Sequence, residues 1–476
     1  MINLGMLAGV LLVIVIVATV AVISGRNVKS TQEFTVAGRR AAWPAVSGIL
    51  VGALVGGSST VGTAQAAFVY GLPAWWFTLG GGIGCLVLGA FFAKPFRNAD
   101  IETLPHFLVS SFGRPIRPLI SVSDSIGVFM TIPGQAASAI ALLAVILHWP
   151  LVPTAALVIL LIILYVFLGG AISAGIAGFA KLLIAFAALL IFGITALSLG
   201  GGVSAFQAAL PAKDFSLFGN GFWSDFGSGF GIILGVLTTQ VYVQAVITGR
   251  SIGQARIGTI VAGIGTMIFG LGGVAVGMFM RIHEPLIKPA EALPLFAQHY
   301  FPSILSGILI GAILITVITC AGGLALGIST MVTRDLYQNY LRPKMEDREG
   351  LFVARTVIAV VVVLGVFAGA SGILKLIINY SFLAFAFRAD AILVPLMLTV
   401  FFPRSRFCTL YAGIGAVACG MLANIGWILH GANNKGALFV GLAGSIVGLI
   451  VGTLVDALVK SRRPIPATVP TKDVVN

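Results

Sequence analysis

The sequence predicts an all-α integral membrane protein with about thirteen membrane-spanning helices. Of its 476 residues, 58% are hydrophobic and only 9% are charged, whereas roughly 25% of the residues of a soluble domain are charged. The apolar residues also gather in runs of about 18 or more, which is the length that a helix needs to cross the hydrocarbon core. The solvent of this chain is therefore a lipid bilayer, and we expect the protein in the cell membrane.

The apolar runs follow one another along most of the chain. The predicted spans are residues 4–24, 43–69, 72–95, 118–147, 151–169, 171–199, 226–247, 257–280, 304–333, 351–370, 376–402, 407–429 and 437–459. The first run lacks the basic start and the cleavage signal of a signal peptide, so we expect it to be retained. Residues 460–476 are polar and contain proline, and we expect them to form a disordered cytoplasmic tail.

Basic residues predict the orientation of the spans. They cluster after spans 1, 3, 7, 9, 11 and 13, and these connections share one side if the spans alternate. The positive-inside rule makes that side cytoplasmic, with the N-terminus outside and the C-terminus inside. The net charge of +13 follows from this topology, so we do not expect nucleic acid as a partner. On the opposite side, connection 281–303 is either an external surface helix or a plain connector.

Glycine interrupts the second predicted span, which reads SGILVGALVGGSSTVGTAQAAFVYG. Glycine weakens helix continuity, and a helix broken at the membrane midplane is tolerated only where its main chain lines a cavity or binds a ligand. We therefore predict a break with a binding site here, and we assign Gly56 and Ser58 to the substrate site. The alternative is that the glycines allow close packing between helices.

Three polar side chains share one face of the ninth predicted span. Thr316, Thr319 and Cys320 are spaced i, i+3 and i+4, which places them side by side on a helix. Hydroxyl oxygens at this position are suitable ligands for a small hard cation. The alternative is that the hydroxyls bond carbonyls of the preceding turn, as they commonly do in membrane helices.

Three segments resemble the sodium:solute symporter family. They are the glycine-rich second span, the stretch ETLPHFLVSSFG, which resembles a TLP-x-F-L element, and TVITC followed by STMVTRDLYQNYL, which resembles the ninth-span signature. The resemblance implies a LeuT-like fold within one transmembrane domain, residues 1–459. Two inverted repeats would cover about 43–199 and 226–402, with one extra helix before them and two after. Substrate and ion would bind near the midplane, beside the broken spans 2 and 7.

The resemblance also implies a sodium site. It would combine main-chain carbonyls of Gly52 and Val55 with Thr316, Thr319 and Cys320. The chain departs from the family at Cys320, where Ser or Thr is usual, and sulfur is a poor ligand for a hard cation. Thr316 stands where the family usually supplies only a carbonyl, so its hydroxyl is a candidate for compensation.

Lys181 is the only Asp, Glu, Lys or Arg between Asp124 and Lys213. Charges inside membrane spans are costly and commonly functional. Lys181 lies one turn beyond Gly178, where the family often has an acid. Three interpretations follow. Its ammonium replaces sodium and carries protons, it pairs with a buried acid such as Asp124, or it extends to the membrane surface.

Two more charges lie inside the eleventh predicted span. Arg388 and Asp390 are two positions apart, so they do not face each other on a helix and each is expected to have its own partner. Arg388 is either a ligand for a substrate carboxylate or part of an internal ion pair. Asp124 is predicted as an acid at a helix end near the inner surface, with a partnership to Lys181 or substrate as the alternative.

Polar residues of the fourth and seventh spans complete the predicted substrate site. Gln135, Gln240 and Tyr242 are assigned to it. Hydrogen bonds to neighbouring helices are the alternative for the two glutamines, because an amide in lipid needs partners.

Together these observations predict a secondary transporter of a small polar organic solute, such as a carboxylate or an amino acid. Sodium coupling is the family expectation, and proton-coupled or uncoupled transport through Lys181 is the alternative. A membrane solute sensor and a channel are further alternatives. No HExxH or nucleotide-binding loop is present, and none of the four cysteines forms a CxxC pair, so we expect no enzyme activity, no cofactor and no metal beyond Na⁺.

Overall fold

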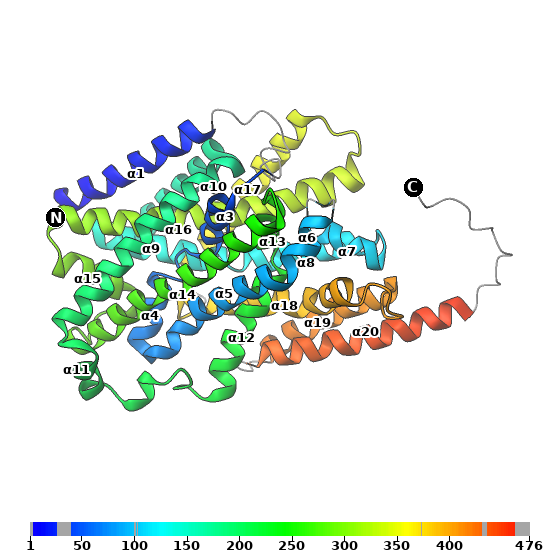
Figure 1. Ribbon diagram of the computed structural model, residues 1–476. Coiled ribbons are helices and arrows are strands. Elements are labelled where there is room, and N and C mark those ends of the chain that lie inside the picture. Colours follow the sequence, from blue (N-terminus) through cyan, green and yellow to red (C-terminus); the bar gives the residue numbers. More distant parts are fainter. Residues whose placement is uncertain are drawn as a thin grey trace.

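A computed structural model describes residues 3–25, 40–99, 101, 103–372, 374–430 and 436–461. Within these ranges the chain is helical, and its one β-type contact is an isolated bridge between Ala41 and Gly249. The all-α prediction is therefore confirmed. Figure 1 shows the helices as a bundle whose members run mostly along one long axis.

The first part of the bundle contains the helices up to Leu147. They are α1 (Leu4–Gly25), α3 (Trp43–Leu54), α4 (Val61–Tyr70), η2 (Leu72–Trp75), α5 (Trp76–Val87), η3 (Leu88–Phe92), α6 (Ala93–Asn98), α7 (Leu104–Phe112), α8 (Ile116–Phe129) and α9 (Ile132–Leu147). The segments from η2 to α6 together form one candidate span, and so do α8 and α9.

The second part runs from Leu151 to Ser461. Its elements are α10 (Leu151–Leu199), α11 (Gly202–Ala209), η4 (Ala212–Phe215), α12 (Phe222–Thr238), α13 (Gln240–Thr248), α14 (Ile252–His283), η5 (Pro289–Glu291), α15 (Ala292–Tyr300), α16 (Ser303–Thr330), η6 (Met331–Leu341), α17 (Asp347–Ala370), α18 (Ile377–Phe401), α19 (Leu410–Leu429) and α20 (Ala437–Ser461). The helix α15 shows that connection 281–303 is more than a plain connector.

The number of long spans differs from the predicted thirteen. In the described ranges, eight helices are long and apolar enough to cross a membrane, and two bent helix pairs raise the number to ten. Three predicted spans contain only shorter apolar helices, which are Leu4–Ile16, Trp43–Leu54 and Leu151–Phe167. The second span falls short because its helix is interrupted, as the glycines predicted.

The fifth and sixth predicted spans are joined in one helix. The 49 residues of α10 continue through position 170, where we expected a connection. The sequence GGAISAGIAG at this point contains neither proline nor charge, so nothing in it interrupts the helical hydrogen bonds. At about 1.5 Å per residue, such a helix is more than twice as long as the roughly 30 Å hydrocarbon core.

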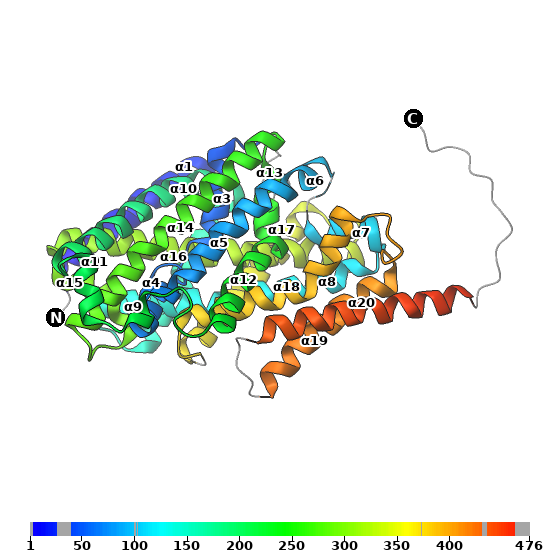
Figure 2. The same ribbon diagram turned by 60° about the horizontal axis from the view of Figure 1, so that its bottom comes forward.

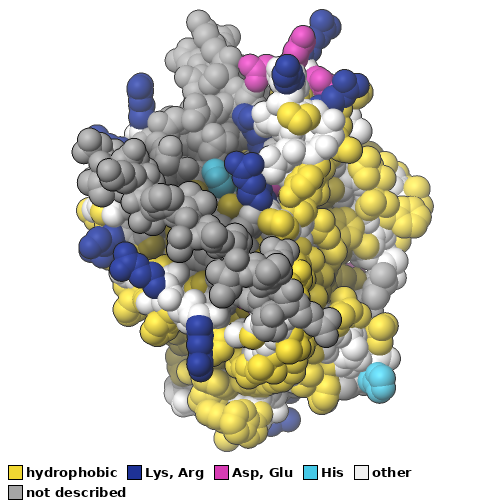
Figure 3. Space-filling view, turned by 90° about the vertical axis from the view of Figure 1, so that its right-hand side faces the viewer, with side chains coloured by type: hydrophobic (Ala, Val, Ile, Leu, Met, Phe, Trp, Pro, Cys, Tyr) yellow, Lys and Arg dark blue, Asp and Glu magenta, His cyan; other side chains and the backbone are white. Residues whose placement is uncertain are grey.

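The connections lie at two opposite ends of the bundle. The start of α1, α11 and α15 lie at one end in Figure 1, and α6 and α7 lie at the other. The Asn3 side chain donates to Ser303 Oγ (3.2 Å) at the first end. Figure 3 views the opposite end, where several Lys and Arg side chains are visible and the visible Asp and Glu side chains gather near the top.

Main-chain hydrogen bonds join the start of α3 to the end of α13. Ala41 donates to the Thr248 carbonyl (3.0 Å), and Arg250 donates to the Ala41 carbonyl (2.8 Å). The Arg97 side chain of α6 adds a bond to the carbonyl of Gly249. The helices α3 and α13 are thus fastened together at the α6 end of the bundle.

Glycine contacts hold the last two helices as an antiparallel hairpin. Figure 2 shows α19 and α20 side by side at the edge of the bundle, next to α18. Gly415 and Gly448 face each other there, and a methyl group on either would collide with the main-chain oxygen of the other. Small residues at such a contact let the two backbones approach closely.

We expect Gly448→Val to separate this hairpin and to lower the apparent melting temperature in detergent, since overpacking costs about 1–3 kcal/mol. Gly426→Ala on α19 is the matched control, because the space beside Gly426 is open. Equal melting temperatures for the two variants would contradict the expected role of this contact.

Candidate functional site

The second predicted span is broken inside the protein. The helix α3 ends at Leu54 and α4 begins at Val61, and the six residues between them are buried. Two amides that would continue the helix bond side chains instead, Gly56 N–H to Ser59 Oγ (2.8 Å) and Gly57 N–H to Gln135 Oε1 (2.5 Å). The predicted break is confirmed, and Gln135 supports it.

Residues predicted for ion and substrate binding meet at this break. A methyl group on Gly56 would collide with Gln135 Oε1 and would lie 2.6 Å from Cys320 Sγ, so only glycine fits. Cys320 donates from Sγ to the Ala53 carbonyl (3.0 Å), and Ser58 Oγ lies 2.7 Å from Ser381 Oγ. The break therefore touches α9, α16 and α18.

The hydroxyls of the two threonines of α16 bond carbonyls of the preceding turn, which was the alternative to cation binding. Thr316 donates to the Ala312 carbonyl (2.7 Å), and Thr319 donates to the Thr316 carbonyl (3.1 Å). Such bonds use the hydroxyl hydrogens and leave oxygen lone pairs. The Cys320–Ala53 contact places α16 beside the last turn of α3, which contains Gly52 and is followed by Val55.

The seventh predicted span is also interrupted. Thr239 has extended backbone angles between α12 and α13, and the two helices differ in direction by 50°. The first amide of α13, at Gln240, donates to Asp124 Oδ2 (2.9 Å). A carboxylate at a helix N-terminus satisfies an amide that has no helical partner.

This bond corrects the prediction for Asp124. We expected an acid at a helix end near the inner surface, but Asp124 lies within α8 and is fully buried. Its partner amide exists only because another span is broken. The Gln240 side chain accepts from Leu104 N–H (2.6 Å), so its oxygen holds the TLPHFL segment. Its assignment to the substrate site stays a prediction.

Arg388 is buried without a hydrogen-bonded acid. Its Nε donates to the Ala384 carbonyl (3.0 Å), and its guanidinium carbon lies 4.4 Å from the Phe385 ring centre. Both terminal nitrogens lack a hydrogen-bond partner among the described residues. Tyr242 stacks on the Phe385 ring, with the ring centres 6.1 Å apart. Arg388 therefore has two donors for a ligand.

Asp390 points to a different part of the protein. Its Oδ2 accepts from Asn424 Nδ2 on α19 (2.5 Å), whereas the Arg388 side chain packs on Gly127 of α8. The prediction of separate partners is confirmed.

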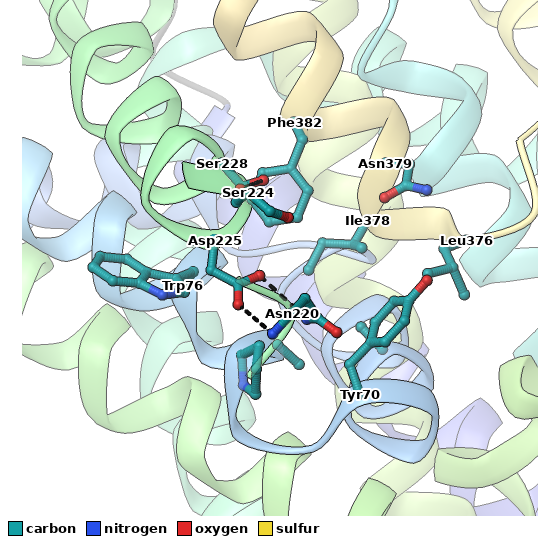
Figure 4. Close-up of a pocket in the computed structure, with 13 residues that line it drawn as sticks. Tyr70, Trp76, Asn220, Ser224, Asp225, Ser228, Leu376, Ile378, Asn379 and Phe382 are labelled. Carbon is teal, nitrogen blue, oxygen red and sulfur yellow. Dashed lines mark hydrogen bonds between the residues drawn. The ribbon is translucent and has the colours of Figure 1, made fainter. Parts of the chain in front are cut away.

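A pocket of about 310 Å³ lies between α12 and the first part of α18, the helix that also carries Arg388 and Asp390. Figure 4 shows Asp225, Ser224 and Ser228 of α12 facing Phe382 and Asn379 of α18 across it. Asp225 accepts from Asn220 N–H (2.8 Å) and from Asn220 Nδ2 (3.2 Å). No Lys, Arg or His lines the pocket, so its described lining favours positively charged groups.

Aromatic rings separate the pocket from Arg388. Phe382 lines the pocket and contacts Phe77 (ring centres 5.9 Å apart), which contacts Phe385 (6.2 Å). Asp225 was missed in the sequence analysis, because an acid close to the start of a span looks like part of a surface connection. The available signal for its burial was the pattern GFWSDFGSGF around it, whose phenylalanines recur at helical spacing. No role was assigned to the three rings from the sequence either.

A polar network closes the α6 end. Asp335 of the TRDLY segment accepts from Arg117 (2.6 Å), from Thr103 of the TLPHFL segment (3.2 Å) and from Ser121 (3.2 Å). Two of the three segments that carried the resemblance are thus in direct contact. A buried acid with three donors is well satisfied.

Lys181 lies in α10, but its side chain is outside the described part of the structure. Its three interpretations stay predictions.

Comparison with known proteins gives consistent results. The model of the sodium:solute symporter family matches residues 34–416. The chain is 24% identical over 390 residues to high-affinity choline transporter 1 of Drosophila melanogaster, covering 76% of this chain and 62% of that protein. It is 25% identical over 183 residues to the osmoregulated proline transporter OpuE of Bacillus subtilis, covering 38% and 35%.

Solved structures show the same fold. A Na⁺-coupled sialic acid symporter in a substrate-bound outward-open state has a TM-score of 0.78 at 17% identity, with 95% of this chain and 97% of that chain covered. A manganese transporter of Eremococcus coleocola has a TM-score of 0.51 at 14% identity, with 88% and 94% covered. The LeuT-like fold predicted from the sequence is confirmed.

We expect Gln135→Leu to destabilise the first break, because it leaves the buried Gly57 amide without an acceptor at a cost of about 1–3 kcal/mol. Its apparent melting temperature in detergent should fall below that of Gln207→Leu, which alters an exposed glutamine on α11. A Gln135→Leu protein as stable as this control would show that the bond does not support the break.

Proposed function

This chain belongs to the sodium:solute symporter family, and we propose that it moves a small zwitterionic solute, such as an amino acid, together with sodium by alternating access. Family membership supports the transport of a small solute across a membrane. The nature of the solute and of the coupling ion is argued from the residues around the two breaks.

The buried guanidinium of Arg388 carries the proposal for the solute. A desolvated cation is costly without an acceptor, and its two free terminal nitrogens match the two oxygens of a carboxylate. The pocket above it offers Asp225 beside Trp76 and Phe382, which suits an ammonium group. From Phe382 to Arg388, six residues of helix rise about 9 Å. The ammonium would therefore contact Asp225 on entry, before the carboxylate reaches Arg388.

The unequal closure of the two ends supports alternating access. The pocket is bordered by Asn220, which belongs to the connection that contains α11. The opposite end is closed by Asp335 and its three donors. The positive-inside rule makes the α11 end external, so this conformation would receive solute from outside, with the N-terminus outside and the C-terminus in the cytoplasm.

For coupling we propose a sodium site between α3 and α16. The hydroxyl oxygens of Thr316 and Thr319 keep lone pairs for a hard cation, and the Gly52 and Val55 carbonyls belong to the interrupted end of α3. The sulfur of Cys320 makes this site weaker than one with an oxygen ligand. Replacement of sodium by the Lys181 ammonium is the competing proposal.

We expect Arg388→Gln to raise the concentration of proline needed for half-maximal binding by about 30-fold, because the charged contact between the guanidinium and the proline carboxylate is lost. Thermal shift with proline, choline and mannose measures this effect. Proline should stabilise the wild type, and Arg355→Gln on the exposed face of α17 should retain that response. Stabilisation by choline or mannose but not by any carboxylate would contradict the proposed solute class.

The coupling ion is tested by uptake into proteoliposomes of a solute that passes the thermal-shift screen. Thr319→Ala should need a roughly tenfold higher sodium concentration for half-maximal uptake, and Cys320→Ser should need less sodium than wild type. Thr266→Ala on α14 is the control, since Thr266 makes the same type of bond, to Ala262 (2.7 Å). Sodium-independent uptake that is lost in Lys181→Ala would favour the lysine proposal instead.

A further inference from the structure

A second buried polar cluster lies away from both breaks, where α18 contacts the α19–α20 hairpin. Asp390 occupies its centre with no exposed surface, in the middle of the 25-residue helix α18. Among the described residues, its side chain has one hydrogen bond, which Asn424 Nδ2 donates to Oδ2. Nothing in the proposed transport of solute and sodium uses this carboxyl.

Three oxygens of this cluster have no hydrogen-bond partner in the part of the chain that the structure describes. They are Asp390 Oδ1, Asn424 Oδ1 and Ser445 Oγ, contributed by α18, α19 and α20. Buried polar atoms are rarely left unpaired, and each such case needs an explanation. Three acceptors gathered at one helix contact indicate that a donor or a cation binds there.

Glycines press the hairpin directly onto this group. Gly420 and Gly441 lie one helical turn before Asn424 and Ser445, respectively, so each shares a helix face with its polar neighbour. A methyl group on Gly441 would collide with the Asp390 carboxyl, and one on Gly420 would collide with the Asp390 carbonyl oxygen. The second methyl would also lie 3.1 Å from Ser445 Cβ. The contact is too tight for a large ligand.

No basic group neutralises Asp390. No salt bridge to it is formed within the described ranges. The elements packed on α18 are α4, α7, α8, α9, α12, α19 and α20, and ring contacts add α5, η3 and α13. Their described titratable side chains are Tyr70, Cys85, His106, Arg117, Asp124, Asp225, Tyr242, Tyr411, Cys419 and Asp456, and α9 and η3 have none. None of them is hydrogen-bonded to Asp390, and Arg388 on the same helix faces α8.

We propose that Asp390 is a proton-binding site. Its protonated carboxyl donates a hydrogen bond to Asn424 Oδ1 or Ser445 Oγ, and this bond joins α18 to the hairpin. A proton needs no cavity, and one proton pairs two of the three oxygens, Asp390 Oδ1 and the oxygen that accepts from it. An ionised carboxylate in lipid without a counter-ion is strongly disfavoured. Release of the proton leaves that charge unpaired and loosens the helix that also carries Arg388.

Infrared spectroscopy of the reconstituted protein tests this site without reference to transport. Wild type carrying ¹³C-labelled aspartate should show a protonated carboxyl C=O band at pH 7 that is absent from Asp390→Asn. Asp456→Asn on α20 should retain the band. Ser445→Ala and Asn424→Leu each keep the carboxyl, and the variant that removes the accepting oxygen should shift the band frequency. This pair covers the case in which Asp390→Asn does not fold.

Two outcomes would overturn the proposal. The first is a wild-type spectrum that does not differ from that of Asp390→Asn and is unchanged in Ser445→Ala and in Asn424→Leu, which would mean that Asp390 is ionised. The second is loss of the band when sodium chloride replaces choline chloride at constant pH, which would make the cluster a sodium site. The proposed solute and coupling ion would be unaffected by either result.

Discussion

Main-chain hydrogen bonding in lipid is the constraint on which this architecture depends. A membrane span can be interrupted only where other groups replace the missing helical bonds. Both interruptions meet this condition through one pair of helices, because Gln135 of α9 supports the break before α4 and Asp124 of α8 supports the start of α13. Since α8 and α9 form one span, a single element determines the geometry of both breaks and of the groups around them.

The charges of α18 divide the interior into two regions. Arg388 lies among Phe385 and the helices of the interrupted spans, with free donors. Asp390 lies against the hairpin, with a free acceptor. Opposite charges two positions apart on a helix point in different directions, so they do not cancel each other. Each region therefore keeps a chemical preference of its own within one helix.

Local features of the sequence predicted the helices well, and long-range contacts were harder to foresee. Apolar runs located nearly every helix, and glycines located the break before α4. The continuity of α10 was missed because two adjacent glycines resembled a connection. The partner of Asp124 could not be derived, since it is an amide exposed by a break in another span. Asp225 was overlooked because its burial depends on α18, which lies about 150 residues further along the chain.

The main-chain bonds between Ala41 and the end of α13 have a mechanical consequence. They fix α3 and α13, the halves of the two interrupted spans at the α6 end, to each other, while the other halves, α4 and α12, lie on the far side of residues 55–60 and Thr239. We therefore expect a displacement of α3 to carry α13 with it. In mechanical terms α3 and α13 form one unit, and residues 55–60 and Thr239 are the two places where that unit adjoins the rest of its spans.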